Sequence, residues 1–211
     1  MTEQDLGFIH RFEPGGETKA TPLLLLHGTG GNEYDLLPLG RAIAPGAPLL
    51  SPRGKVLENG LPRFFRRFAE GVFDLEDLRR RAGELADFTV NACKKYDLES
   101  PIALGYSNGA NIAAALLQLR PEILAGGILY RAMVPIDEPV HGRLDAKPIL
   151  IISGKHDMIV PLANAKRLAT ILKEAGADVD HQSLPAGHAL TEQDMDAAKR
   201  WFPHVSASLR N

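Results

Sequence analysis

The chain has 211 residues, of which 45% are hydrophobic and 24% are charged, values that suit one globular domain and exclude a disordered or fibrous chain. Its 24 basic and 26 acidic residues leave a net charge of −2, which argues against a nucleic-acid partner. No apolar run comes near the roughly 20 residues of a membrane span, no secretory signal is visible, and the single cysteine, Cys93, fits a reducing compartment. We therefore expect a cytoplasmic protein with one domain over residues 1–211.

Short apolar runs alternate along the chain with segments of helical period. Continuous apolar runs suit strands buried on both faces of a parallel sheet, so the alternation predicts an α/β fold. Ligands of such sheets bind at the carboxyl ends of the strands. In chain order, the predicted elements are strands at 22–26 and near 48–51, a helix at 75–96, a strand at 101–105, a helix at 107–120, strands at 125–130 and 147–152, a helix at 161–175, an edge strand at 178–184 and a helix at 191–205.

Two predicted helices carry clear signals at their first residues. Asp74 is a plausible N-cap for the helix at 75–96, because its short carboxylate can accept a hydrogen bond from a free backbone N–H. Thr191 and Asp194 have the spacing of a capping box and predict the start of the last helix.

Residues 105–109 read G-Y-S-N-G and lie between an apolar strand and an Ala-rich helix. A sharp turn at this place lifts the Ser107 hydroxyl above the sheet, at the positive end of the helix that follows. A glycine-rich turn without chemistry is the alternative, since the motif also arises by chance. The strand before it and the helix after it favour Ser107 as a nucleophile.

A nucleophilic serine needs a base that takes its proton and an acid that orients the base. In a strand–turn–helix site of this kind the chain order is serine, acid, histidine, which selects Asp157 after the strand at 147–152 and His188 after the edge strand. His156 is the main rival base, and Asp178 and Asp180 are rival acids. Each selected residue could instead serve only to cap or pack its loop.

Acyl transfer also needs N–H donors for the developing oxyanion. We expect the backbone N–H of Asn108, after the serine, and that of Thr29 in H-G-T-G-G, with Gly30 as the fallback and as a substrate-binding position. The competing interpretation, a phosphate-binding loop, lacks both a third glycine, where Glu33 stands, and a G-K-[ST] ending. The sequence contains no pattern of metal ligands such as H-E-x-x-H or paired cysteines.

Taken together, L-L-L-L-H-G-T-G-G-N-E, the R-G of S-P-R-G, G-Y-S-N-G-A-N-I-A, G-K-H-D-M-I-V-P and A-G-H-A-L resemble the α/β-hydrolase superfamily over essentially the whole chain. Within it, they look like the compact phospholipase/carboxylesterase family, and most like bacterial hydrolases linked to hydroquinone and catechol stress. The resemblance implies the α/β-hydrolase fold, with a mainly parallel sheet, helices on both faces and no separate cap domain. It also implies a triad of Ser107, Asp157 and His188, activity on small esters and, as is common in the group, a homodimer.

Two departures from related groups bear on the substrate. Acyl-protein thioesterases of the broader group usually have Gln after the serine, where Asn108 stands here, which argues against depalmitoylation. Dienelactone hydrolases use Cys as the nucleophile, whereas Ser107 occupies that position here. Cys93 lies on a predicted helix and is expected to fill core space.

Residues 52–74 form an insertion that is rich in Phe and Arg. Its phenylalanines could form a lid or an acyl wall, or a satellite core under a long loop, which we favour. Arg53 could meet a substrate carboxylate or be a solvated surface charge, and Phe65 is a candidate for contact with the substrate. Met158 and Ile159, directly after Asp157, are candidates for an acyl pocket.

These residues predict a serine carboxylesterase that cleaves small-molecule esters without a cofactor, metal ion, nucleic acid or membrane span. A thioesterase or a hydrolase of lactones from ring cleavage uses the same parts and stays open as an alternative. A binding protein that keeps the fold without catalysis is the remaining alternative, since a fold alone does not fix a function.

Overall fold

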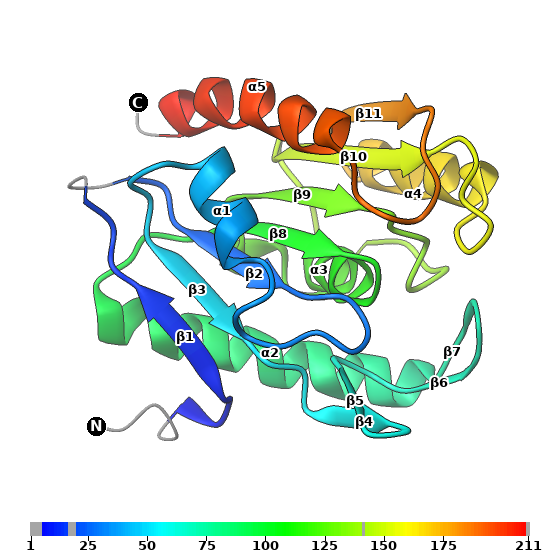
Figure 1. Ribbon diagram of the computed structural model, residues 1–211, viewed down its shortest axis with the longest axis horizontal. Coiled ribbons are helices and arrows are strands. Elements are labelled where there is room, and N and C mark those ends of the chain that lie inside the picture. The colour runs from blue at the N-terminus through cyan, green and yellow to red at the C-terminus, as the bar shows by residue number, and fades with distance from the viewer. Residues whose placement is uncertain (1–5, 17–19, 141, 210–211) are drawn as a thin grey trace.

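The computed structural model describes residues 6–16, 20–140 and 142–209, and a seven-stranded sheet runs through its centre (Figure 1). The strands are β1 (His10–Glu13), β2 (Leu23–Leu26), β3 (Leu49–Pro52), β8 (Ile102–Tyr106), β9 (Gly126–Tyr130), β10 (Pro148–Gly154) and β11 (Asp178–Leu184). Their spatial order is β1-β3-β2-β8-β9-β10-β11. β1 is antiparallel to β3 and every other neighbouring pair is parallel, so the carboxyl ends of the parallel strands share one edge.

Helices cover both faces of this sheet (Figure 1). Toward the viewer lie α1 and α5, and behind the sheet lie α2, α3 and α4. A 3-10 turn, Pro121–Ile123, joins α3 to β9. The helices are α1 (Leu37–Ile43), α2 (Leu75–Tyr96), α3 (Asn108–Leu119), α4 (Leu162–Glu174) and α5 (Glu192–Ser208).

The four leucines of β2 show why the run from 22 to 26 forms a central strand. Successive side chains of a strand point to opposite faces. Leu24 and Leu26 pack into the core under α2, α3 and α4, while Leu23 and Leu25 pack into the core under α1 and α5. All four are fully buried, so a continuous apolar run satisfies both layers at once.

The expected helix starts are confirmed at α2 and α5. The Asp74 carboxylate accepts a hydrogen bond from the N–H of Asp77, which caps α2. At α5, the Asp194 carboxylate accepts from the N–H of Thr191 and the Thr191 side chain accepts from the N–H of Asp194, the reciprocal pair of a capping box. Both caps satisfy backbone donors that a helix leaves free at its first turn.

The insertion contains two small antiparallel hairpins that we did not expect as strands. They are β4 (Val56–Glu58) with β5 (Leu61–Arg63), and β6 (Arg67–Ala69) with β7 (Val72–Phe73). Each strand has two or three residues, too few for a strand period to stand out in the sequence. β1 and α1 were also missed, and β11 is the expected edge strand.

The predicted mainly parallel α/β architecture is therefore confirmed, and no separate cap domain stands over the sheet in the part of the chain described. We propose that the chain is a single domain. Across residues 6–16, 20–140 and 142–209, none of the helices is both long and apolar enough to cross a membrane.

Candidate active site

Ser107 stands on a strained turn between β8 and α3. Its backbone has φ 52° and ψ −115°, in the region that non-glycine residues rarely adopt. A Cβ on Gly105 would lie 2.6 Å from the Gly109 carbonyl oxygen, and a Cβ on Gly109 would lie 1.9 Å from the Leu26 carbonyl oxygen. The turn is closed by backbone on both sides, so only glycine fits at these two positions, as the motif predicts.

The ends of three strands bring Ser107, Asp157 and His188 into one hydrogen-bonded chain. Ser107 follows β8, Asp157 follows β10 and His188 follows β11. His188 Nε2 lies 2.9 Å from Ser107 Oγ, and His188 Nδ1 lies 2.8 Å from Asp157 Oδ2. Because an ionised carboxylate can only accept, the proton sits on Nδ1 and Nε2 is left to accept from the serine hydroxyl.

The Asp157 carboxylate is fully buried and accepts three hydrogen bonds. Its second oxygen, Oδ1, accepts from the N–H groups of Ile159 and Val160 at 2.8 and 2.9 Å. Asp157 thus also holds its own loop, which was the competing interpretation, and it does both at once. The rivals His156, Asp178 and Asp180 are exposed and contact neither Ser107 nor His188.

Two backbone N–H groups near Ser107 remain available for an oxyanion. Among the described residues, neither the Thr29 N–H nor the Asn108 N–H has a protein acceptor. The Gly30 N–H, our fallback, donates to the Pro62 carbonyl oxygen at 2.9 Å and is therefore already used. The two donors that the sequence favours therefore have no competing protein acceptor in the part of the chain described.

The insertion contacts both candidate oxyanion donors, Asn108 and the loop of residues 27–31 that carries Thr29, which we call the oxyanion loop. Phe64 N–H donates to the Asn108 side-chain oxygen at 2.7 Å, and Arg63 Nη1 donates to the Thr29 hydroxyl at 2.8 Å. Phe64 is buried and its ring lies 4.7 Å from the His27 ring. The insertion is therefore neither only a lid nor only a satellite core, because it forms the wall behind the oxyanion donors.

His27 links the oxyanion loop to the insertion and is not placed for catalysis. Gly54 N–H donates to its Nε2 at 2.9 Å, so its Nδ1 carries the proton and donates to the Gly28 carbonyl oxygen at 2.7 Å. Burial lowers the pKa of His27 below 6.5, which keeps the ring neutral. A protonated ring could not accept from Gly54.

The structure corrects two of the five substrate-binding predictions. Arg53 forms a two-pronged ion pair with Glu33, and that guanidinium lowers the pKa of the Glu33 carboxyl, so Arg53 is committed within the protein. Phe65 is fully buried against Phe73 and belongs to the core. The ion pair of Arg53, whose side chain is 37% exposed, and the burial of Phe65 both depend on how the insertion folds.

The other three predictions keep their place beside the site. Gly30 is exposed within the oxyanion loop, and a Cβ there would meet the side chain of Leu61 at 3.4 Å. Met158 is 94% exposed and Ile159 is 40% exposed, directly after Asp157. Their contact with a substrate stays a prediction.

Tyr106 and Arg131 contact the loop of His188, and sequence reasoning missed both. The Tyr106 hydroxyl donates to the His188 carbonyl oxygen at 3.2 Å. Arg131 Nε donates to the Gly187 carbonyl oxygen at 2.8 Å, although the two residues are 56 positions apart. A charge directly after the apolar run 126–130 was the available signal, since such a charge is either at the surface or paired.

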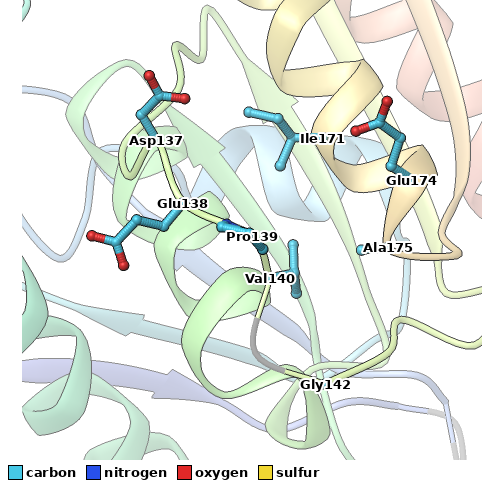
Figure 2. A pocket seen from close by; sticks show the side chains of 8 residues that line it. All are labelled: Asp137, Glu138, Pro139, Val140, Gly142, Ile171, Glu174 and Ala175. Carbon is cyan, nitrogen blue, oxygen red and sulfur yellow. The ribbon is translucent and has the colours of Figure 1, made fainter.

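Several cavities among the described residues lie away from this site. One of about 370 Å³ is lined by residues 137–140, Gly142 and the last turn of α4. In Figure 2 the carboxylates of Asp137 and Glu138 point away from each other, and they pair with Arg167 and Arg79. The cavity opens at the end of α4 opposite Asp157.

No group of three or more potential metal ligands occurs among residues 6–16, 20–140 and 142–209. Cys93 lies on α2 and is partly exposed rather than in the core. Burial raises the pKa of its thiol to about 11, so it is mostly protonated at neutral pH.

Comparison with known proteins identifies the family of the chain. The model of the phospholipase/carboxylesterase family matches residues 77–205. The protein MhqD of Bacillus subtilis (strain 168) is 45% identical over 195 residues, which are 92% of this chain and 96% of that protein.

Solved structures give the same result. The Bacillus cereus carboxylesterase has a TM-score of 0.90 at 45% identity, covering 92% of this chain and 93% of that one. The carboxylesterase from Mesorhizobium loti has a TM-score of 0.89 at 33% identity, covering 94% and 96%. The chain therefore belongs to the phospholipase/carboxylesterase family of α/β-hydrolases and is a carboxylic ester hydrolase by class.

Proposed function

We propose that the protein is a serine carboxylesterase that cleaves small esters through an acyl-enzyme at Ser107. The observation that carries the proposal is the hydrogen-bonded chain Ser107–His188–Asp157, with contacts of 2.9 and 2.8 Å, in which Ser107 stands on a strained turn. A base within hydrogen-bonding distance of the hydroxyl, itself oriented by a buried carboxylate, is what an activated serine requires.

In the first half-reaction Ser107 Oγ attacks the ester carbonyl carbon while its proton passes to His188 Nε2. The carbonyl oxygen becomes an oxyanion, which the N–H groups of Thr29 and Asn108 stabilise. Asp157 stabilises the charged ring through Nδ1. The tetrahedral intermediate collapses when His188 gives its proton to the leaving alcohol, and the acyl group stays on Ser107.

In the second half-reaction a water molecule takes the place of the alcohol. His188 accepts its proton as the water oxygen attacks the acyl carbon, and the same two N–H groups stabilise the second oxyanion. Collapse returns the proton to Ser107 Oγ and releases the carboxylic acid. Neither step consumes or produces electrons, so the chain's own residues suffice for the whole cycle.

Apolar side chains beside the oxyanion loop and the acid loop favour esters with apolar groups. Leu61 is half exposed next to Gly30, and Met158 and Ile159 are exposed next to Asp157. Because the Arg53 guanidinium is paired with Glu33, it is not free to bind a substrate carboxylate. We therefore place uncharged esters before carboxylate-bearing ones.

The test is hydrolysis of p-nitrophenyl esters from acetate to long acyl chains, by the native protein and by Ser107→Ala. We expect turnover that is greatest for short chains and falls by about 10⁴-fold or more in the variant, because the nucleophile is lost. Matched oxygen and sulfur esters then decide between an esterase and a thioesterase.

Turnover that survives in a folded Ser107→Ala protein would overturn the assignment of the nucleophile. A folded native protein that hydrolyses none of the esters, oxygen or sulfur, would overturn the proposed function in favour of a binding role. The homodimer stays a prediction, which sedimentation or light scattering tests directly.

A further inference from the structure

Each of the three consecutive carbonyl oxygens around His188 has a side-chain donor from the sheet. Arg131 Nε donates to Gly187, the Tyr106 hydroxyl donates to His188 itself, and Arg131 Nη2 donates to Ala189, at 2.8, 3.2 and 3.1 Å. Backbone carbonyls of a surface loop are usually left to water. Here the loop is tied to the ends of two central strands, β8 and β9.

Arg131 uses all five of its side-chain donors within the protein. A guanidinium carries five N–H groups. Besides the two loop carbonyls, they reach the Ile152 carbonyl oxygen at 3.3 Å and both oxygens of Asp194 at 2.7 and 2.9 Å. The side chain is fully buried. Asp194 supplies the opposite charge, without which a buried guanidinium would be very costly.

The backbone of Arg131 adopts a strained conformation. Its φ is +56°, a value that non-glycine residues seldom adopt, and its N–H donates to the Ile152 carbonyl oxygen. Such strain persists only where the surroundings hold it in place, and it clusters at functional sites. Asp194 is also fixed, because it accepts from Thr191 in the capping box of α5.

We infer that Arg131 and Tyr106 are positioning residues that fix the backbone of His188, so that its ring stays aimed at Ser107 while its proton moves. The inference rests on the proposed function. The ring nitrogens contact Ser107 and Asp157, the ring lies 5.5 Å from the ring of Tyr106, and the contact with Ser107 breaks in each half-reaction. Asp157 holds one nitrogen of the ring, so the aim of the other nitrogen at Ser107 also depends on the backbone of His188, which Arg131 and Tyr106 hold.

Two variants test the inference. Tyr106→Phe keeps the ring and removes one donor, and we expect kcat to fall about fivefold. Arg131→Lys keeps the charge but offers a single ammonium in place of a planar fork, and we expect kcat to fall about 10-fold to 100-fold, because small misplacements of a catalytic group are costly. KM should change little in either, since neither side chain is assigned to the substrate.

A stability control separates positioning from loss of fold. Leu172 is fully buried in the core on α4, so Leu172→Ala destabilises the protein without touching the histidine loop. All proteins are compared at a temperature where circular dichroism shows them folded. We expect Leu172→Ala to lower the melting temperature and to leave kcat within about twofold of the native value.

Two further readouts follow His188 itself. The first is the labelling rate of Ser107 by a fluorophosphonate, in which Oγ bonds to phosphorus, fluoride leaves and the proton goes to His188. The second is the tautomer of the His188 ring from ¹H–¹⁵N correlation spectra of ¹⁵N-labelled protein. The native ring should show one tautomer, protonated on Nδ1, and Arg131→Lys should show a mixture and slower labelling.

Equal labelling rates and one tautomer in the native, Tyr106→Phe and Arg131→Lys proteins would overturn the inference. The inference would also be overturned if Leu172→Ala had the same melting temperature as Arg131→Lys and showed the same fall in kcat. A native protein that reacts with neither esters nor the fluorophosphonate would instead refute the proposed function, and the tautomer measurement would still decide whether Arg131 orients the ring.

Discussion

The turn of Ser107 and the loop of His188 are held in opposite ways. Backbone closes around the serine turn, where Gly105 and Gly109 touch neighbouring main chain so closely that no Cβ fits. The histidine loop is held by the side chains of Arg131 and Tyr106, which lie far from it in the sequence. The fit of the serine turn is local and steric, so any side chain at these two glycines disturbs it. The histidine loop depends on hydrogen bonds from residues distant in sequence, which substitutions can remove one at a time.

The acid of the histidine side gives the largest expected effect on activity. Asp157→Asn can still accept from Ile159 and Val160 through its amide oxygen, but its NH₂ faces His188 Nδ1 and favours the wrong tautomer. We expect kcat on p-nitrophenyl acetate to fall about 10⁴-fold with a small change in melting temperature. Activity within tenfold of the native value would exclude Asp157 as the orienting acid.

On the serine side, the largest expected effect is on folding. In Gly109→Ala the new Cβ meets the Leu26 carbonyl oxygen, which belongs to a central strand and cannot move aside. We expect a loss of about 3 kcal/mol or more in the free energy of unfolding, measured with urea.

Gly83 provides the matched control, because it also lies within a helix and a Cβ there meets nothing within 4 Å. Gly83→Ala should stabilise the protein by about 0.5–1 kcal/mol. If both variants unfold alike, the steric account of the serine turn is wrong.

Asn108→Ala and Asn111→Ala sharpen the role of the oxyanion donors. Both asparagines are buried on α3 and each accepts from one backbone N–H, that of Phe64 or that of Met133. Each variant should lose about 1–3 kcal/mol of stability, since a buried N–H loses its partner. Only Asn108→Ala should also lower kcat, by about tenfold, because only Phe64 belongs to the wall behind the oxyanion donors.

His27 gives the smallest expected effect, and it depends on pH. Its pKa is lowered in the folded protein, so above pH 6.5 both the folded and unfolded chains hold it neutral and its contribution is complete. As the pH falls below 6.5, the unfolded chain takes up the proton first, and stability falls by up to about 1.4 kcal/mol per pH unit until the folded pKa is reached.

His27→Gln lacks this proton, so the slope of unfolding free energy against pH should be shallower than in the native protein. Other titrating groups are common to both and cancel in the difference. Equal slopes between pH 5 and 6.5 would show that the ring of His27 is not held neutral.

The contrast between the two loops also explains how far the sequence could be read. The serine turn is contained in five consecutive residues, so its glycines and flanking elements predict it. The acid and the histidine follow from chain order at strand ends. Arg131 could not be found in this way, because its role depends on contacts with residues 187 and 189, which only the folded sheet brings near.

The insertion shows the limit for the fold. Its strands are too short for a period, so two hairpins, their bracing of the oxyanion loop, the pairing of Arg53 and the burial of Phe65 were not predictable. Central strands such as β2 were predictable, because burial on both faces leaves an unbroken apolar run.

The five bonds of Arg131 have a consequence for the order of assembly. Four of them join the end of β9 to residues that lie 56 to 63 positions later in the chain, and closing so long a segment is slow compared with forming a turn or a helix. The docking of the histidine loop is therefore a late event in folding. During refolding, the native circular dichroism signal should return before ester hydrolysis does. The delay between the two measures the time that the histidine loop needs to dock beside Ser107.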